Sequence, residues 1–242
     1  MPRHRILALW AVPRSASTAF ERMMIERGDH HVVDEPFSAH YYFGEQKVSP
    51  RFEAVEPNSR PDQILTSLVS AAEERPVFVK DMAYHASGVA TAELVATFHN
   101  AFLIREPLGA VASLAGKWPD FTDEEAGFGA LATMIDLVEQ AGQDVVVIDQ
   151  DDLCRDPSGV VRRYCDRMGI PFLEDALCWE PGMRPEWERW SDWHESSAAS
   201  TGFEPPKPPT NEPLPARVLD VVSRCQPIYE ALHERRLRPT AP

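Results

Sequence analysis

Short apolar runs alternate with longer amphipathic stretches along the first two thirds of the chain. The apolar runs predict strands at residues 6–12, 31–34, 77–80, 101–104 and 145–148. The stretches between them predict helices at residues 19–26, 62–73, 91–97 and 108–116. Strands that alternate with helices are typical of a mostly parallel sheet covered on both faces, which is a three-layer α/β sandwich. Ligands of such sheets bind at the carboxyl ends of the strands, so we expect the site at that edge.

The pattern thins after residue 172. A segment rich in Trp and Pro at about residues 179–212 predicts a lid or loop that covers the cleft or binds a partner, and a final helix is expected at about residues 215–234. Trp187, Trp190 and Trp193 have helical spacing, which fits core or lid packing as well as stacking on a ligand. A chain of 242 residues can bury one substantial core, so we expect a single domain over residues 1–242.

The turn after the first strand has the composition of an anion site. Residues 13–18 read Pro-Arg-Ser-Ala-Ser-Thr and lie between a predicted strand and a predicted helix. The free N–H groups and the positive dipole end of a helix N-terminus attract phosphate or sulfate. Arg14 would add a fixed charge, and hydroxyl donors would come from Ser15, Ser17 and Thr18. The alternative is an ordinary turn in which Ser15 or Ser17 caps the helix.

A second arginine follows the predicted strand at residues 101–104. Arg105 is followed by Glu106 and Pro107, and proline is favoured in the first turn of a helix. Ser113 lies about two turns into that helix. Arg105 and Ser113 are therefore expected to hold a second anionic group together.

These two stretches resemble the sulfotransferase family that uses 3′-phosphoadenosine-5′-phosphosulfate (PAPS). In that family a Pro-Lys/Arg-Ser-Gly-Ser/Thr-Thr turn holds the 5′-phosphosulfate, and residues 13–18 match it except that Ala16 stands in place of glycine. The family holds the 3′-phosphate with an Arg-(Asp/Glu)-Pro motif and a serine at the spacing found in residues 105–113. A third likeness is the order of Asp-Asp-Leu, Asp-Pro and Gly-Ile-Pro-Phe within residues 151–172. The resemblance implies a P-loop-like sulfotransferase fold with PAPS as the sulfuryl donor.

The resemblance also implies catalytic roles. Arg14 is expected to stabilise the leaving phosphate. Glu35 is the expected base, because a comparable Glu-Pro occurs in a subset of the family in which the glutamate is the proposed base. His85 is the rival base, although it follows Lys80 by five residues and the family's histidine follows its lysine by two. Lys80 is expected either to bridge the sulfonate or to pair with Asp81 or Glu35.

The C-terminal part of the donor site is less complete. Thr201 and Gly202 resemble the loop that closes over the 3′-phosphate in the family, but the family's Arg-Lys-Gly string is absent. The cations that could substitute for it are Arg184, Arg189 and Lys207. The expected donor-binding residues are thus Arg14, Ser15, Ala16, Ser17, Thr18, Arg105, Ser113, Thr201 and Gly202.

The composition and net charge of the chain exclude several classes of binding partner. A formal net charge of −14 argues against nucleic acid or an anionic membrane, because both are bound through summed positive charge. The chain has no apolar run of about 18 residues, and its first residues lead into a strand instead of a signal peptide, so we expect a cytoplasmic protein. Its four cysteines and its histidines lack metal-site spacing, so no metal is expected. The oligomeric state is left open, with a homodimer among the alternatives.

The expected function is transfer of a sulfuryl group from PAPS to a hydroxyl of a small-molecule acceptor, with an amine in second place. The aromatic and His-rich residues 37–43 predict a partly apolar acceptor pocket. One alternative is a kinase-like phosphotransferase that uses the same turn for ATP, against which the missing Gly-Lys argues. The other is a non-catalytic scaffold or carrier-protein partner, which the absent glycine and the absent Arg-Lys-Gly leave open.

Overall fold

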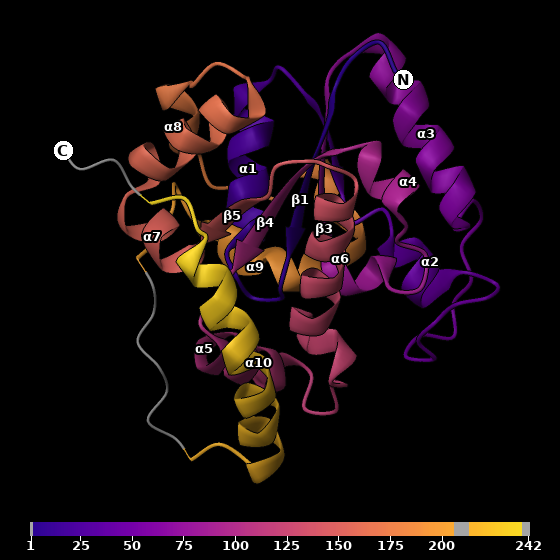
Figure 1. Cartoon of the computed structure of the whole chain (residues 1–242), viewed down its shortest axis with the longest axis vertical. Helices are drawn as coiled ribbons and strands as arrows, with labels where there is room; N and C mark the ends of the chain where they lie inside the picture. Colours follow the sequence, from indigo (N-terminus) through magenta and orange to yellow (C-terminus); the bar gives the residue numbers. More distant parts are fainter. Residues whose placement is uncertain (1, 206–212, 239–242) are drawn as a thin grey trace.

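One parallel sheet forms the centre of the molecule. The computed structural model describes residues 2–205 and 213–238. Five strands lie in the order β2-β3-β1-β4-β5, and each neighbouring pair is parallel (Figure 1). They are β1 (Ile6–Ala11), β2 (His31–Asp34), β3 (Val77–Met82), β4 (His99–Ile104) and β5 (Val146–Asp149). All five predicted strands are confirmed, with β3 running two residues further than expected and β4 starting two residues earlier.

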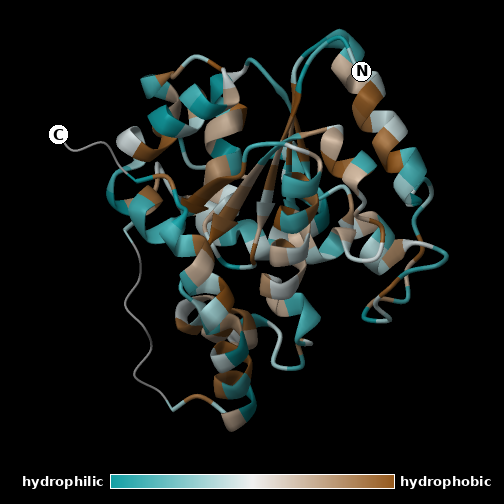
Figure 2. Cartoon of the chain, in the orientation of Figure 1, coloured by the Kyte–Doolittle hydropathy of each residue, from teal (hydrophilic) through white to brown (hydrophobic). Residues whose placement is uncertain are grey.

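Hydrophobic side chains cover both faces of this sheet. In β1, Ile6, Ala8 and Trp10 belong to one core cluster, and the alternate residues Leu7, Leu9 and Ala11 belong to a second. Alternation of this kind is imposed by the two-residue period of a strand. Figure 2 shows the apolar strands in the centre and hydrophilic positions on the surrounding helices. The predicted three-layer α/β architecture is therefore confirmed.

The helices divide between the two faces. The first cluster receives side chains from α3 (Pro61–Glu74), α4 (Ala92–Ala96), α5 (Pro107–Lys117), α6 (Phe128–Gln140) and α10 (Ala216–Glu234). The second receives side chains from α1 (Ser17–Arg27), α2 (Ser38–Phe43), α7 (Gln150–Arg155) and α8 (Pro157–Met168). Each predicted helix overlaps one of these. Short 3₁₀ turns complete the described elements: η1 (Ala83–Ala86), η2 (Glu124–Ala126), η3 (Glu174–Leu177) and η4 (Pro185–Trp190).

The Trp-rich segment is more helical than its composition suggests. η4 runs directly into α9 (Ser191–Ala199), which packs against α1. The expected C-terminal helix is confirmed as α10, which lies beside α5 (Figure 1). Residues 206–212 of the expected lid, including Lys207, lie outside the described residues. No helix in the described part of the chain is long and apolar enough to cross a membrane.

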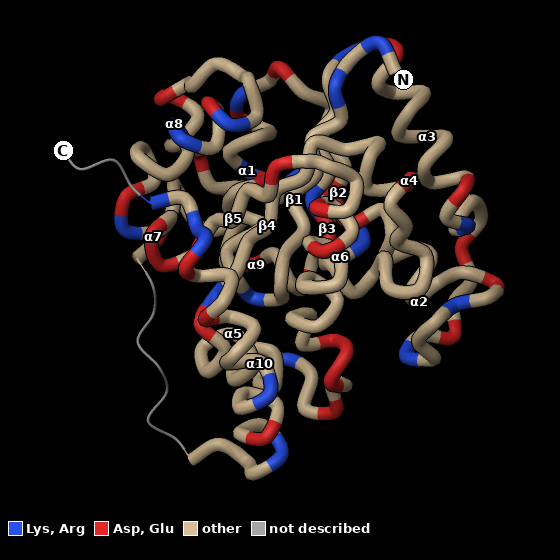
Figure 3. Tube along the Cα trace, viewed as in Figure 1, with Lys and Arg blue, Asp and Glu red and all other residues tan. Residues whose placement is uncertain are grey.

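Charged side chains also enter the centre of the fold. Most Lys, Arg, Asp and Glu positions lie on the outer helices and loops, but several lie beside β2 and β3 (Figure 3). In β3, Lys80 and Asp81 are fully buried, and Asp34 at the end of β2 is buried next to them. Buried charges are costly unless they are paired. The carboxyl ends of β2 and β3 are therefore where we look for a functional site.

Candidate functional site

The turn between β1 and α1 is shaped to receive an anion. Arg14 and Ala16 have left-handed backbone conformations, with φ of 64° and 65°. Alternate left-handed residues direct successive N–H groups into one concavity. Ala16 is the N-cap residue of α1 and no side chain caps the helix, so the capping alternative is wrong. The hydroxyl of Ser15 donates instead to the Val12 carbonyl at 2.7 Å, which leaves the first N–H groups of α1 for a ligand. We call residues 13–18 the anion loop.

Two arginines meet beside the anion loop. Arg14 Nε donates to Ser113 Oγ at 3.0 Å, and Arg105 donates to the Arg14 carbonyl at 2.6 Å. Burial and the nearby Arg105 lower the pKa of Arg14, and burial lowers the pKa of Arg105. Gly109 makes room for this arrangement, because a Cβ there would lie 3.0 Å from Arg105 Nε. The structure thus brings Arg14, Arg105 and Ser113 together, but Ser113 bonds to Arg14 and not to its expected partner Arg105, and the holding of an anion by Arg105 and Ser113 stays a prediction.

A cluster of acids surrounds Lys80 at the ends of β2 and β3. The Lys80 ammonium donates to Glu35 Oε1 at 2.7 Å, pairs with Asp34 and lies 3.6 Å from Glu21 Oε2. Lys80 therefore pairs with Glu35, as one of the alternatives expected. It does not line the cavity described below, because it is fully buried behind the carboxylates.

The charges in this cluster are unequal. Burial opposes the charged form of Lys80, but Asp34 and Glu35 raise the pKa of Lys80 well above its ordinary value. Burial also opposes ionisation of Asp34, yet Lys80 and His194 hold the pKa of Asp34 below its ordinary value. Burial and the neighbouring Asp34 raise the pKa of Glu21 well above its ordinary value. Within this cluster, Glu21 is therefore the carboxyl group whose ionisation its surroundings oppose most clearly.

Glu35 is held in a strained turn. Its φ is 44°, and its N–H donates to the Lys80 carbonyl at 2.7 Å. Its own carbonyl accepts from the N–H and the hydroxyl of Ser38, at 3.1 and 2.6 Å. Strain persists where surrounding bonds over-determine the backbone, and this pattern is common at functional sites. The turn fixes where the Glu35 carboxylate lies relative to Lys80.

His85 lies behind Glu35. Its Nδ1 is 2.7 Å from Asp81 Oδ1 and 4.0 Å from Glu35 Oε2. Its Nε2 is buried and has no hydrogen-bond partner among the described residues. Burial raises the pKa of Asp81, and the His85 hydrogen bond partly opposes that shift. Tyr84 packs on the imidazole with ring centroids 4.4 Å apart.

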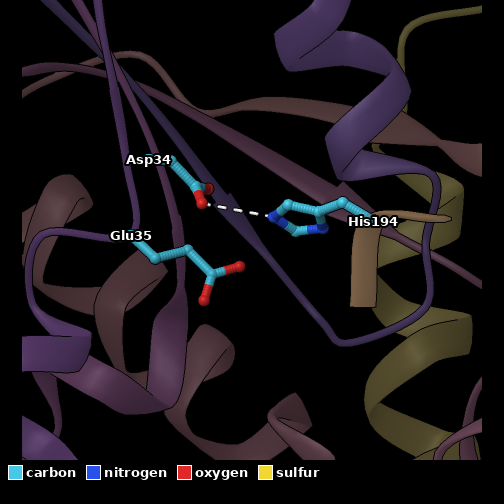
Figure 4. Close-up of side chains that lie close together, drawn as sticks. All are labelled: Asp34, Glu35 and His194. Carbon is cyan, nitrogen blue, oxygen red and sulfur yellow. Dashed lines mark hydrogen bonds and ion pairs between the residues drawn. The ribbon is translucent and has the colours of Figure 1, made fainter. Parts of the chain in front are cut away.

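Asp34, Glu35 and His194 form a group whose ligand atoms lie within 4.8 Å of one another (Figure 4). Such spacing is compatible with a metal ion. However, the Lys80 ammonium already bonds to Glu35 and pairs with Asp34. We therefore infer that the Lys80 ammonium is the cation that neutralises these carboxylates. That the protein needs no metal stays a prediction.

A cavity of about 690 Å³ joins the positive and acidic parts of the site. Ten of the residues predicted from the sequence line it: Arg14, Ser15, Ala16, Ser17, Thr18, Glu35, His85, Arg105, Ser113 and Gly202. Thr201 is exposed and outside the lining, and its carbonyl accepts from the Trp179 N–H at 3.1 Å. The predicted closure by Thr201 over the donor therefore has no counterpart in this structure.

The walls of the cavity differ from the expectation. Residues 37–43 do not line it, since Tyr41 and Tyr42 of α2 are buried against Tyr84. Trp190 and Trp193 do line it, together with Trp118, whereas Trp187 is buried and donates to Glu21 at 3.2 Å. Arg184 and Arg189 do not reach the lining, because they pair with Glu186 and Glu56.

Three polar residues of the site were missed by the sequence analysis. Asp34 was passed over in favour of its neighbour Glu35, Glu21 looked like an ordinary helix residue, and His194 had no motif around it. The sequence offers one indication for Glu21, which is its position seven residues after Arg14 in the helix that follows the anion loop. Nothing in the sequence indicated that His194 meets Asp34.

Together, the anion loop, the two arginines and the facing carboxylate give the cavity a positive part and an acidic part, an arrangement compatible with a group transferase. The sequence model of the sulfotransferase domain matches residues 4–236. The chain therefore belongs to the sulfotransferase family.

Solved structures agree on the fold. The sulfotransferase domain of the Synechococcus PCC 7002 olefin synthase superposes with a TM-score of 0.56 at 14% identity, covering 93% of this chain and 95% of that one. The sulfotransferase domain from the curacin biosynthetic pathway gives 0.52 at 15% identity, covering 99% of both chains. These identities support the P-loop-like sulfotransferase fold alone.

Two curated relatives are closer in sequence and much longer. Branched-chain-amino-acid aminotransferase-like proteins 2 and 1 of Arabidopsis thaliana are 30% and 29% identical over 234 and 240 residues. The match covers 94% and 96% of this chain but only 41% and 42% of those proteins. The chain thus spans less than half the length of these relatives.

Proposed function

We propose that the protein transfers a sulfuryl group from PAPS to a hydroxyl of a small-molecule acceptor, with an amine as the second acceptor class. The observation that carries the proposal is the convergence of Arg14 and Arg105 on the uncapped N-terminus of α1, in the same cavity as Glu35. Two cations and free N–H groups suit a donor with two separate anionic groups. A carboxylate in the same cavity suits removal of a proton from the acceptor.

The residues at the positive end fit the two phosphates of the donor. The anion loop would hold the 5′-phosphosulfate, and Arg105 with Ser113 would hold the 3′-phosphate. When bound, PAPS supplies the sulfuryl group and a leaving phosphate. Arg14 would stabilise the negative charge that develops on the leaving side, as preorganised donors do in phosphoryl transfer. A guanidinium does not give up its proton near neutral pH, so Arg14 acts by charge and hydrogen bonding.

Glu35 is the residue we propose as the base. One of its oxygens is fixed by Lys80, and the other makes no hydrogen bond among the described residues. His85 also lines the cavity, but it is 1% exposed against 6% for Glu35, and Tyr42 and Tyr84 pack against its ring. The greater exposure of Glu35 therefore favours it as the group that receives the acceptor's proton.

The acceptor would bind between Glu35 and the aromatic wall. Met82, Tyr84, Trp118 and Trp190 line this part of the cavity. Their side chains offer large apolar area and few hydrogen bonds, which suits a partly apolar small molecule. We propose no nucleic acid or membrane as partner, on the charge argument given above. A cytoplasmic location is a separate proposal.

The test is calorimetric titration with 3′-phosphoadenosine-5′-phosphate, the product form of the donor. ADP and AMP serve as controls that lack the 3′-phosphate. A preference of tenfold or more for the bisphosphate, about 1.4 kcal/mol, would support the donor assignment and justify a screen of hydroxylated acceptors with PAPS. Equal binding of all three nucleotides would contradict it.

A further inference from the structure

His194 connects helix α9 to the anion loop. It is the one buried residue of α9, with 3% of its surface exposed. Its Nε2 lies 3.2 Å from Asp34 Oδ2, and its Nδ1 lies 3.4 Å from the Thr18 hydroxyl. Trp187 packs edge-on against the imidazole, with ring centroids 5.3 Å apart. An acid, an imidazole and a hydroxyl therefore form a chain that ends at the anion loop.

The direction of hydrogen bonding along this chain follows from Asp34. Lys80 keeps Asp34 ionised, so Asp34 can only accept, and His194 Nε2 must carry a proton. If the imidazole is neutral, its Nδ1 is an acceptor and takes the hydroxyl hydrogen of Thr18. Thr18 then offers only oxygen lone pairs to the cavity, which repel an anion. If His194 is protonated, Nδ1 donates to Thr18 and the Thr18 hydroxyl hydrogen is free for the anion.

We propose that His194 is a positioning residue for Thr18, and that an anion entering the anion loop takes up one proton on His194. The proposal rests on the donor site described above. It adds a link between anion binding and protonation that runs from Thr18 to His194, a residue outside the motifs described above. α9 carries both His194 and Trp193, which lines the cavity. The contact between His194 and Thr18 therefore also links α9 to the anion loop.

The charged groups around His194 are mainly acidic. Burial and the neighbouring Asp34 oppose the ionisation of Glu21 on α1, and Asp34 and Glu35 are two carboxylates that share one ammonium, Lys80 on β3. His194 Nε2 lies within hydrogen-bond distance of Asp34, one of these two carboxylates.

The remaining neighbours of α9 make other pairs. Arg189 and Glu186 on η4 face Glu56 and Arg184, and Lys117 on α5 bonds to the Asp192 carbonyl. Glu188 of η4 is exposed, as is Glu195 on α9 itself. The charged groups nearest His194 are thus Asp34 and Glu35, and Lys80 in turn contacts both of these and Glu21.

The probe is inorganic sulfate, because it stays fully ionised across the range in which histidines titrate. Its affinity is measured by tryptophan fluorescence at constant ionic strength, between about pH 5.5 and 8.5. We expect the wild-type affinity to fall as pH rises, by up to about tenfold per pH unit where one proton is linked. Failure of sulfate to bind, or an affinity independent of pH, would overturn the proposal.

Two variants locate the proton. In Thr18→Val the contested hydroxyl is gone, and in His194→Gln the amide can still reach Asp34 but offers no Nδ1 to Thr18. Both are expected to bind sulfate with little dependence on pH. The matched control is His30→Gln, which removes a buried histidine that bonds to Asp29 and does not line the cavity; it should keep the wild-type slope. A full slope in His194→Gln would assign the proton elsewhere, and a full slope in Thr18→Val would show that the hydroxyl plays no part.

These outcomes are separate from those of the donor test. If the bisphosphate is not preferred over ADP and AMP, the proposed donor is wrong, yet the sulfate slope can still be present. If the bisphosphate is preferred but the sulfate slope is absent, the donor stands and the role of His194 does not.

Discussion

The two ends of the cavity are built in different ways. At the positive end, Arg105 follows β4 directly and Arg14 comes three residues after β1, and the backbone of these turns and the two helix starts do most of the positioning. At the acidic end, Glu35 depends on residues from β2, β3 and α9 that are far apart in the sequence. The first end consists of two local strand-to-helix turns that the parallel pairing of β1 with β4 brings together, whereas the second end depends on tertiary contacts throughout. The positive end should therefore tolerate changes elsewhere in the fold, while the acidic end should not.

The largest effect is expected at the acidic end. Glu35→Gln keeps the size of the side chain but removes the proposed base, so turnover should fall by a factor of about 10² to 10⁴. Affinity for the bisphosphate should stay close to wild type, because the positive end is untouched. Initial-rate kinetics with PAPS and calorimetry measure the two quantities. Glu45→Gln, an exposed glutamate outside the cavity, is the control, and full turnover in Glu35→Gln would move the base to His85.

Removing the central cation should mainly affect folding. Lys80→Met leaves Asp34 and Glu35 buried without their partner, and breaking a buried pair costs about 3 to 5 kcal/mol of unfolding free energy. The low pKa of Asp34 stabilises the fold above the pKa of the unfolded carboxyl, and this contribution is lost as pH falls. The difference between Lys80→Met and wild type should therefore shrink in acid. Urea unfolding at two pH values tests this, with Lys117→Met as the exposed control; a constant difference would contradict it.

Substitutions at the positive end should weaken nucleotide binding and leave folding stability nearly unchanged. Arg105→Ala removes one of two converging cations, and we expect bisphosphate affinity to drop by about 2 to 5 kcal/mol. Calorimetry measures the drop, and the unfolding midpoint should change little. Arg155→Ala, which removes an exposed arginine paired with Asp151, should bind like wild type. Unchanged binding in Arg105→Ala would show that the 3′-phosphate lies elsewhere.

The smallest effect concerns the backbone of the anion loop. Ala16 has φ of 65°, where a residue with a Cβ is strained by roughly 1 to 2 kcal/mol and glycine is not. Ala16→Gly should raise stability by a few tenths of a kcal/mol or more, after the greater unfolded-state entropy of glycine is subtracted. Ala71→Gly, within α3, should have the opposite sign because glycine weakens helices. A loss of stability in Ala16→Gly would mean that the loop is not strained.

The same contrast explains what could be predicted from the sequence. The strands are set by patterns within a few residues, and these predictions are confirmed by the structure. Arg14, Arg105 and Ser113 line one cavity as the sequence leads us to expect, but Ser113 bonds to Arg14 and not to Arg105, and the binding of an anion there stays a prediction. The sequence leaves Lys80 to bridge the sulfonate or to pair with Asp81 or Glu35, because the parallel pairing of β2 and β3 is needed to choose among these.

The errors have equally specific causes. The aromatic residues 37–43 were expected to line the cavity, but α2 turns Tyr41 and Tyr42 toward Tyr84 and the core. His194 was missed because only the docking of α9 on α1 brings it to Asp34. Thr201 was placed at the donor by resemblance, while its backbone actually pairs with Trp179.

Four non-glycine residues in the described chain have a left-handed backbone, and three of them, Arg14, Ala16 and Glu35, line the cavity. Backbone strain in the described chain is thus concentrated at the cavity in which we propose that the reaction occurs. Selection for thermal stability alone would relax these positions toward glycine or asparagine first. A laboratory lineage evolved only for heat resistance is therefore expected to replace the side chains at positions 14 and 35, whose roles we propose above, before it loses the fold.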